Sequence, residues 1–470
     1  MLPKNLKYGS KVESAPARSS RSNIAPQNGT GNYNLGDNII INIPTRANLV
    51  MVPTECYLKF DLQLKSIGND NCFRWDSCGA HGLIQRIRVY HGSNLLEDID
   101  NYGMLAKMLF DLQVPTDASY GKYNVMCGTR NDLVVKKNQE LALDATSSLT
   151  ALNNNLLSAI QVNSGEYFLN AGGTTSLIAN NGLTATNTYC LNLISIIGSL
   201  CSQSYFPLFA CTSSPLRVEI QLVDSLIKAL ATQTGGTINL LNNVEFVANF
   251  IELSDIAMSM ISQNLQGQPL QFVVPQYKNY VSSQWSLGTS STQISVPISA
   301  KFSSLKSLIA TCRDKGTGAL QYMPFSSVSA RIDQYTFRIG PNVFPSKAPS
   351  KFTEMFCECL KAIGSISDLN YHPSIEKLSY TLDASTSGNS ATDTTYNAVQ
   401  SGSFYIGLDL ENYSSASKDS IFAGYNSNTD EIYLNINYNA QATAFIPRFD
   451  IFACYDCVFV FENNTAYIRF

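Results

Sequence analysis

The sequence contains few charged residues for its length. Of its 470 residues, 14% are Asp, Glu, Lys or Arg, whereas globular proteins carry about 25%. Asn, Ser, Thr and Gln fill the segments where Lys and Glu would normally lie. Disordered chains combine high charge with few aromatic residues, so the 10% aromatic content excludes general disorder. The length allows two or three domains, or two large all-β ones, and such a chain buries enough surface to fold without disulfides or metals.

Three further absences narrow the functional class. The net charge of −4 shows no basic excess, which argues against a dedicated nucleic-acid-binding protein. No apolar run reaches the roughly 18 residues that a membrane-spanning helix needs. Residues 1–8 contain no apolar stretch of the kind found in signal peptides. We therefore expect a protein that is made and kept in a cytosol or nucleus.

The 12 cysteines are too few for a disulfide scaffold in a chain of this length. Two close pairs, Cys357 with Cys359 and Cys454 with Cys457, raise the alternatives of a zinc site or a redox dithiol. A structural zinc site usually takes its four ligands as two close pairs, but these pairs lie far apart in sequence and one has the wrong spacing. We therefore predict reduced, mostly buried thiols that pack as small apolar side chains.

Candidate catalytic residues are also sparse. The three histidines, His81, His91 and His372, lie in no recognised nucleophile motif. A Ser-His-Asp or Cys-His site would also need a group that orients the base. We predict structural or surface positions for all three histidines.

An acidic cluster, Glu97, Asp98 and Asp100, precedes a predicted helix. Two carboxylates on facing strands could cleave a glycosidic bond, whereas carboxylates just before a helix can stabilise its N-terminal dipole. We favour the second interpretation, in which the cluster caps the helix.

Other polar motifs predict no site. Gly235–Gly236 opens a strand-like segment, whereas a phosphate-binding loop needs a following helix and a Lys. Two acidic positions lack the repeated oxygen ligands of a calcium loop, and three glycosylation patterns are interpreted as chance matches in an Asn-rich chain. These residues are Asp368 near Asn370, Asp430 beside Glu431, and Asn28, Asn412 and Asn463. We predict no catalytic, cofactor-binding or metal-binding residue.

Short alternating segments indicate an all-β protein. Apolar and polar residues alternate in 56–64, 216–222, 294–298 and 404–410, which is typical of strands with one buried face. Residues 39–43 and 451–459 also read as strands. Many short strands separated by Gly, Asn and Pro favour sandwiches or barrels.

Only two helices are predicted. Apolar residues recur at helical spacing from Tyr102 to Leu112, and Pro115 follows the end of this segment. Ser350 can cap a second helix, in which Phe352, Phe356, Cys359 and Ile363 share one face before Gly364 ends it. Residues 145–200 are rich in Asn, Ser, Thr and Leu, and a loop of this length is usually functional.

A weak internal repeat suggests a duplicated domain. Residues 86–90 lead into a turn at Gly92, a second short strand and an amphipathic helix. Residues 335–339 lead into a turn at Gly340, followed by the same elements. The two glycines, which supply the positive φ of a tight hairpin, lie 248 residues apart.

Residues 1–30 form a weakly basic arm rich in Ser, Asn, Pro and Gly. Two interpretations stay open: a solvated tail, or an arm that becomes ordered on contact with a neighbour, a membrane surface or nucleic acid. Its charged residues are Lys4, Lys7, Lys11, Arg18 and Arg21 against Glu13.

Several segments together resemble the double-jelly-roll major capsid proteins of icosahedral DNA viruses. The likeness is greatest to adintoviruses, Polinton-like viruses and virophages, and adenovirus hexon is more distant. None of the segments is a catalytic motif; they are patterns of fold and packing. They are 36–41, 104–112, 303–308, 337–340, 344–345, 406–411, 455–456 and 468–470.

The resemblance implies two consecutive eight-stranded jelly-roll sandwiches and a structural, non-enzymatic role without cofactors or a small-molecule substrate. Three subunits would form a pseudo-hexagonal capsomer that tiles an icosahedral shell around a DNA genome. Expected partners are neighbouring capsomers, penton and minor capsid proteins, with the arm contacting genome, inner membrane or an adjacent subunit. The expected divisions are an arm at 1–30, a first jelly roll at 31–225 with a surface loop at 115–200, a linker at 226–270 and a second jelly roll at 271–470.

The residues alone leave another class open, a β-sandwich carbohydrate-binding or attachment protein of lectin or fibre type. A jelly-roll glycosidase that uses Glu97 and Asp98 is a further alternative. A stable trimer in solution would favour the capsid hypothesis, and saturable glycan binding would favour the attachment protein.

Overall fold

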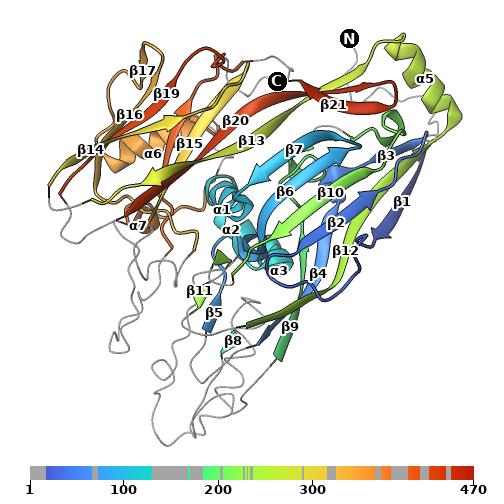
Figure 1. The fold of residues 1–470 in the computed structure, drawn as a ribbon, viewed down its shortest axis with the longest axis horizontal. Helices are drawn as coiled ribbons and strands as arrows, with labels where there is room; N and C mark the ends of the chain where they lie inside the picture. The colour runs from blue at the N-terminus through green and yellow to red at the C-terminus, as the bar shows by residue number, and fades with distance from the viewer. Residues whose placement is uncertain are drawn as a thin grey trace, which may run out of the picture.

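Two β-sandwiches, one from each half of the chain, lie side by side (Figure 1). The computed structural model describes residues 17–65, 72–129, 168–169, 184–201, 205–225, 228–229, 231–232, 237–287, 290–314, 324–364, 366, 372–382, 401–412, 423–440 and 446–469. Everything below concerns these residues.

The first sandwich pairs two antiparallel sheets. One has the order β1 (Ala17–Ile24), β12 (Thr237–Leu253), β4 (Tyr57–Lys65), β9 (Thr184–Leu191), and β3 (Leu49–Met51) also pairs with β12. The other has the order β2 (Asn38–Ile43), β10 (Leu216–Leu222), β6 (Ile84–His91), β7 (Asn94–Asp100). A small sheet of β11 (Ala231–Thr232), β5 (Cys72–Arg74) and β8 (Phe168–Leu169) lies apart from them.

The second sandwich repeats this plan. One sheet has the order β13 (Leu270–Gln284), β20 (Pro447–Glu462), β15 (Leu305–Asp314), β18 (Tyr405–Asp409), and β21 (Thr465–Arg469) also pairs with β20. The other has the order β14 (Thr292–Ile298), β19 (Ile432–Tyr438), β16 (Ile332–Ile339), β17 (Asn342–Phe344).

The eight strands on the main paths of the two sandwiches have the same topology, and the added strands β3 and β21 come from different places in the chain order. β3 pairs with β12 beyond the end of β4, and β21 pairs with β20 beyond the end of β15, so each continues the line of its neighbour. Each sandwich therefore has eight strand positions, four in each sheet. This confirms the prediction of an all-β fold with two consecutive eight-stranded sandwiches.

The predicted hairpin repeat is present in both halves. Gly92 connects β6 to β7 with a φ of 58°, and Gly340 connects β16 to β17 with a φ of 55°. Helix α1 (Tyr102–Gln113) follows the first hairpin, and α6 (Phe352–Lys361) follows the second. α6 begins after Lys351 rather than Ser350, because the Ser350 N–H donates to the Glu354 carboxylate instead of Ser350 capping the helix.

The alternating segments are strands with one buried face, with one exception. In β10 every second side chain from Leu216 to Leu222 is buried. Residues 404–408 instead bury both faces, with Tyr405 0% exposed, and Asp409 is the only exposed residue of 404–410. Tyr405 was expected on the solvent side, but its hydroxyl contacts Asp111 of the first sandwich.

Several predicted boundaries differ from the observed elements. β1 lies within the segment predicted as an arm, and β12 lies within the predicted linker and joins the first sandwich. The predicted surface loop at 115–200 contains α2 (Thr116–Tyr120), α3 (Lys122–Cys127) and β9. Residues 1–16, 130–167 and 170–183 lie outside the described residues.

The remaining helices are short. They are α5 (Asp255–Leu265), which connects β12 to β13, α7 (Lys377–Tyr380), and the 3-10 turns Pro53–Glu55, Gly79–Leu83, Ser199–Cys201 and Leu208–Ala210. Within the described part of the chain, no helix has the length and apolarity to span a membrane.

Helix α6 packs directly on β18 at Gly407. A Cβ atom at this position would lie 2.6 Å from the Cα atom of Cys359. We expect Gly407→Ala to cost about 1–3 kcal/mol in the free energy of unfolding, because neither backbone can yield without moving its element. Gly364→Ala is the matched control, since a Cβ there meets no atom within 4 Å. Equal urea midpoints for the two variants would contradict this packing.

Candidate functional site

A buried polar region lies where the two sandwiches meet. Helix α1 occupies the centre of this junction, and its residues Tyr102–Leu112 are all buried. The sequence pattern predicted an amphipathic helix, and the structure corrects this: the second sandwich covers the polar side. A helix buried all round is normally apolar, yet this one contains Lys107 and Asp111.

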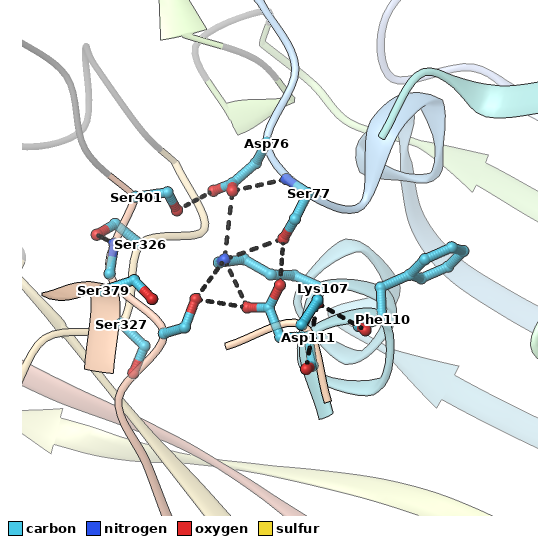
Figure 2. Close-up of polar contacts among 12 residues, drawn as sticks. Asp76, Ser77, Lys107, Phe110, Asp111, Ser326, Ser327, Ser379 and Ser401 are labelled. Atoms are coloured by element: carbon cyan, nitrogen blue, oxygen red, sulfur yellow. Dashed lines mark hydrogen bonds and ion pairs between the residues drawn. The ribbon is translucent and has the colours of Figure 1, made fainter. Parts of the chain in front are cut away.

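Lys107 carries a buried positive charge held by two carboxylates. Its Nζ lies 2.8 Å from Oδ2 of Asp111, one turn along the helix, and 3.3 Å from Oδ1 of Asp76. Nζ also donates to the Ser77 hydroxyl at 3.1 Å and to the Ser403 hydroxyl at 3.3 Å. Figure 2 shows the ammonium group surrounded by these oxygens.

The second sandwich completes the network with hydroxyl groups. Ser403 and Tyr405 donate to Oδ2 of Asp111 at 2.8 and 2.7 Å. Ser401 donates to Oδ2 of Asp76 at 2.8 Å. Asp76 and Asp111 therefore both accept hydrogen bonds from the second sandwich, and these bonds form only when the two sandwiches have the correct relative placement.

The charges in this network favour the ionised lysine. Burial opposes the charge on Lys107, but Asp111 and Asp76 outweigh this cost and raise the pKa of the lysine above its ordinary value. One ammonium faces two carboxylates, and the hydroxyl donors stabilise the remaining negative charge. The ensemble forms a fixed ionic contact with no free acid or base.

An apolar contact lies beside the ionic one. Phe325 of the second sandwich is 4% exposed and approaches Gly82 and Gly103 of the first. A Cβ at Gly103 would lie 2.6 Å from the Phe325 ring, and one at Gly82 would lie 2.9 Å from it. Both glycines are therefore needed to admit this aromatic ring.

A second contact joins β6 and β7 to the strands of the C-terminal half. Gln276 of β13 donates to the Leu96 carbonyl at 2.9 Å and accepts from the Tyr455 hydroxyl at 3.0 Å. The Ala466 N–H of β21 donates to Nδ1 of His91 at 3.1 Å, and the Ala466 carbonyl accepts from Asn94 at 3.0 Å. The last strand of the chain is thus tied to the first sandwich.

The acidic cluster does not cap α1, which corrects the prediction. Asp98 forms an ion pair with Arg86 at 2.7 Å, and Asp100 accepts from the Asn101 N–H. Glu97 is 2% exposed and accepts from the Ser195 hydroxyl and the Ile196 N–H. Burial raises the pKa of Glu97 to about 8, so this carboxyl is largely protonated at neutral pH.

Two histidines are buried in structural positions and the third lies at the surface, in line with the prediction of structural or surface positions. His81 is buried against the Tyr102 hydroxyl at 3.0 Å, and burial lowers its pKa to about 3. His91 uses both ring nitrogens, since Nε2 also lies 3.1 Å from the Cys211 carbonyl. His372 is exposed.

The cysteines of the two close pairs are free thiols. Cys359, Cys454 and Cys457 are buried and Cys357 is partly buried. Burial raises the pKa of the three buried thiols to about 12, so they stay protonated and unreactive. Among the described residues, no group of three His, Cys, Asp or Glu side chains could hold a metal ion.

The remaining polar motifs, for which no site was predicted, form local hydrogen bonds or lie at the surface. Asp430 accepts from the Tyr425 hydroxyl at 2.5 Å, and Glu431 accepts from the Tyr433 hydroxyl at 2.9 Å. Asn28 anchors the chain by donating to the Asn38 carbonyl at 2.6 Å, and Asn412 and Asn463 are exposed. Gly235, Gly236, Asp368 and Asn370 lie outside the described residues.

A cavity of about 550 Å³ opens between the C-terminal ends of α1 and α6. Its charged lining residues are already engaged: Lys306 lies 2.7 Å from Glu411, Lys361 2.5 Å from Glu358, and Asp409 accepts from the Glu411 N–H at 2.9 Å. Each of these charged side chains therefore already has a partner within the chain.

Comparisons with known proteins place the fold. No protein-family model matches the sequence, and no curated protein matches it. Among solved structures, VP54 of PBCV-1, fitted into a reconstruction of the virophage Sputnik, has a TM-score of 0.59 and 12% identity, covering 99% of this chain and 100% of that one. A chain of the Sputnik virophage structure has a TM-score of 0.60 and 11% identity, covering 100% and 91%. The mavirus major capsid protein has a TM-score of 0.58 and 10% identity, covering 100% and 93%.

The chain has the double-jelly-roll fold of these capsid proteins. The likeness runs through both sandwiches, so the resemblance inferred from sequence is confirmed for the fold. The junction around Lys107 was not predicted. Its one signal in the sequence was the pair Lys107 and Asp111, four residues apart in an otherwise apolar helix.

Removing the buried ammonium should destabilise the junction strongly. We expect Lys107→Met to lower the free energy of unfolding by about 3–5 kcal/mol, because Asp76 and Asp111 would be left buried without a counter-charge. The matched control is Lys228→Met, since Lys228 lies 2.8 Å from Asp224 in an exposed pair of the same sequence spacing. That loss should stay below about 1 kcal/mol. Urea unfolding of both variants measures the difference, and similar losses would contradict a buried ionic contact.

Glu97 should make stability depend on pH. The pKa of Glu97 in the folded protein is about 8, above the ordinary 4.5. Between these pH values the folded state therefore binds more protons than the unfolded state. The contribution of Glu97 to stability is fully present below the lower value and is lost as pH rises through about 8, at no more than about 1.4 kcal/mol per pH unit. Glu97→Gln resembles the protonated acid and should flatten this slope.

Melting temperatures between about pH 5 and about pH 9 measure the Glu97 effect. Glu462→Gln serves as the control, because Glu462 is exposed and accepts a hydrogen bond from the Tyr467 hydroxyl at 2.9 Å. An unchanged slope in Glu97→Gln would show that other groups set the pH dependence.

Proposed function

We propose that this protein is a viral major capsid protein that self-assembles into trimeric capsomers. The observation that carries the proposal is the shared fold, which covers both sandwiches of this chain and 91% or more of the capsid proteins compared above. In the proposed assembly, three copies contribute six sandwiches of one topology. Their pseudo-hexagonal block tiles an icosahedral shell around a DNA genome.

The junction supports this proposal physically. A capsomer with near-hexagonal outline requires the two sandwiches of a copy to keep one relative orientation. Directional hydrogen bonds to Asp76 and Asp111, and the ring of Phe325 against Gly103, hold such an orientation. The low charge content, 14% of residues, also limits like-charge repulsion between many packed copies.

The strands support a division of the chain that differs from the sequence boundaries. We propose a first jelly roll that extends through β12 to Leu253, a linker that contains α5, and a second jelly roll that begins with β13 at Leu270. The predicted linker at 226–270 is shortened accordingly.

The proposed role is structural, and the protein acts through its surfaces. Its partners in the shell are other copies of the same capsomer, together with penton and minor capsid proteins. The proposed location is the virion, after synthesis and assembly in the host cytoplasm or nucleus.

Light scattering after size exclusion, followed by negative-stain imaging, tests the proposal directly. We expect a particle of three times 51.5 kDa with a hexagonal outline. A monodisperse monomer would contradict the capsomer. Saturable binding to a glycan array by that monomer would support the attachment protein instead.

A further inference from the structure

Strand β1 is an edge strand held almost entirely by its backbone. All eight of its residues pair with β12, from Ala17 opposite Leu253 to Ile24 opposite Phe246. None of its side chains is buried, and only Ile24 packs partly against the core. Most strands are fixed in place by the burial of apolar surface. β1 buries little of it, so its detachment would expose little apolar surface.

The second sandwich supplies an internal comparison. β13 occupies the same topological position as β1, next to the last long strand of its sandwich. β13 buries Val274 and Gln276, and Phe272 and Tyr277 pack against the core. Of the two equivalent strands, β13 is therefore anchored by buried side chains and β1 is not.

The edge of β12 nevertheless needs a partner strand. Without β1, the N–H and C=O groups of residues 246–253 on that edge would be unpaired, and open edges of this length template pairing with other chains. The backbone ladder requires an eight-residue strand at this place, but no buried side chain specifies which copy supplies it.

The chain after β1 is anchored independently of β1. The Gln27 N–H donates to the Ile40 carbonyl at 2.7 Å. Asn28 donates to the Asn38 carbonyl at 2.6 Å and accepts from the Ile40 N–H at 3.2 Å. These bonds fix the chain on β2, so a change of direction at Ala25 and Pro26 would move β1 and leave the sandwich intact.

The charges on β1 suit the edge of β12 in its own subunit and in a neighbouring one alike. β1 contains Arg18 and Arg21 and no acidic residue. On the β12 side, Asn23 donates to Glu245 at 3.0 Å, and Glu245 also lies 3.5 Å from Lys59. Arg18 is opposite Glu252, which lies 3.7 Å from Arg46. β1 therefore brings basic and polar side chains, and no acidic one, to an edge that contains these two glutamates.

From these observations we propose that β1 is exchanged between copies in the assembled protein, so that β1 of one subunit pairs with β12 of its neighbour. The exchanged ladder keeps the register Ser19 to Ile251 and Ser22 to Ala248 that the single chain has. Exchange of an identical element costs little, because the same hydrogen bonds form in either arrangement. The proposal rests on the self-assembly proposed above and adds the surface and segment that link the copies.

A cysteine pair tests which copy supplies the strand. Ser19→Cys with Ile251→Cys places two thiols opposite each other across the ladder. The protein is assembled, oxidised and run on a denaturing gel without reductant, beside the parent protein. We expect covalently linked species of two or more copies. Mixing the two single variants before assembly should also give a covalent dimer, which no internal bond can produce.

The matched control is Ser295→Cys with Asn435→Cys. These residues lie opposite each other on β14 and β19 within one sandwich, and their side chains are 2.7 Å apart. This pair should form only internal links. If the first pair fails to oxidise, Ser22→Cys with Ala248→Cys tests the same pairing of β1 with β12 at a second position.

The outcomes separate the two proposals. A trimer in which the Ser19 and Ile251 pair forms only internal links overturns strand exchange and leaves the capsomer standing. A protein that light scattering shows to be monomeric overturns self-assembly, and exchange with it. Intermolecular links in the trimer, with internal links alone in the control, support exchange.

Discussion

The buried ammonium of Lys107 is the group around which the two sandwiches are joined. Its counter-charges, Asp76 and Asp111, belong to the first sandwich, but the hydroxyls that complete their hydrogen bonds come from Ser401, Ser403 and Tyr405 of the second. Neither sandwich alone satisfies the network. Burying three charges costs desolvation energy that their attraction barely repays, so the contact contributes more to orientation than to stability.

The same constraint explains features that are otherwise unrelated. Gly82 and Gly103 lack side chains where the Phe325 ring enters. Tyr405 is buried on a strand face that its alternating pattern assigned to solvent, because its hydroxyl reaches Asp111. α1 is buried on the side that carries its charged residues. Each of these departures from a local rule occurs at the junction, where the second sandwich replaces water.

Local patterns of burial and turn residues predicted the all-β class, both helices and the repeated hairpin, and the resemblance to the capsid proteins implied the two eight-stranded sandwiches. The sequence patterns did not reveal β1, because the hydrogen bonds of this strand with β12 need no apolar side chain. β12 itself was predicted to be part of a linker. The junction could not be predicted, because Asp76, Lys107 and Ser401 meet only after three distant segments fold together. Glu97 was interpreted as a helix cap, whereas the strand carries its side chain into the interior.

The two halves share one topology, but their edges differ. In the C-terminal half, β13 anchors itself with buried side chains and β21 reaches across to His91 and Asn94. These extensions tie the second sandwich to the first within one chain. In the N-terminal half, the equivalent strand β1 has neither a buried side chain nor, within the described chain, a hydrogen bond to the other sandwich. Its polar side chains face the edge of β12, where Asn23 donates to Glu245. Selection for a fixed contact within the subunit would preserve the first arrangement. An arm that links separate subunits needs the second, because a strand with a buried side-chain anchor could not leave its own sandwich.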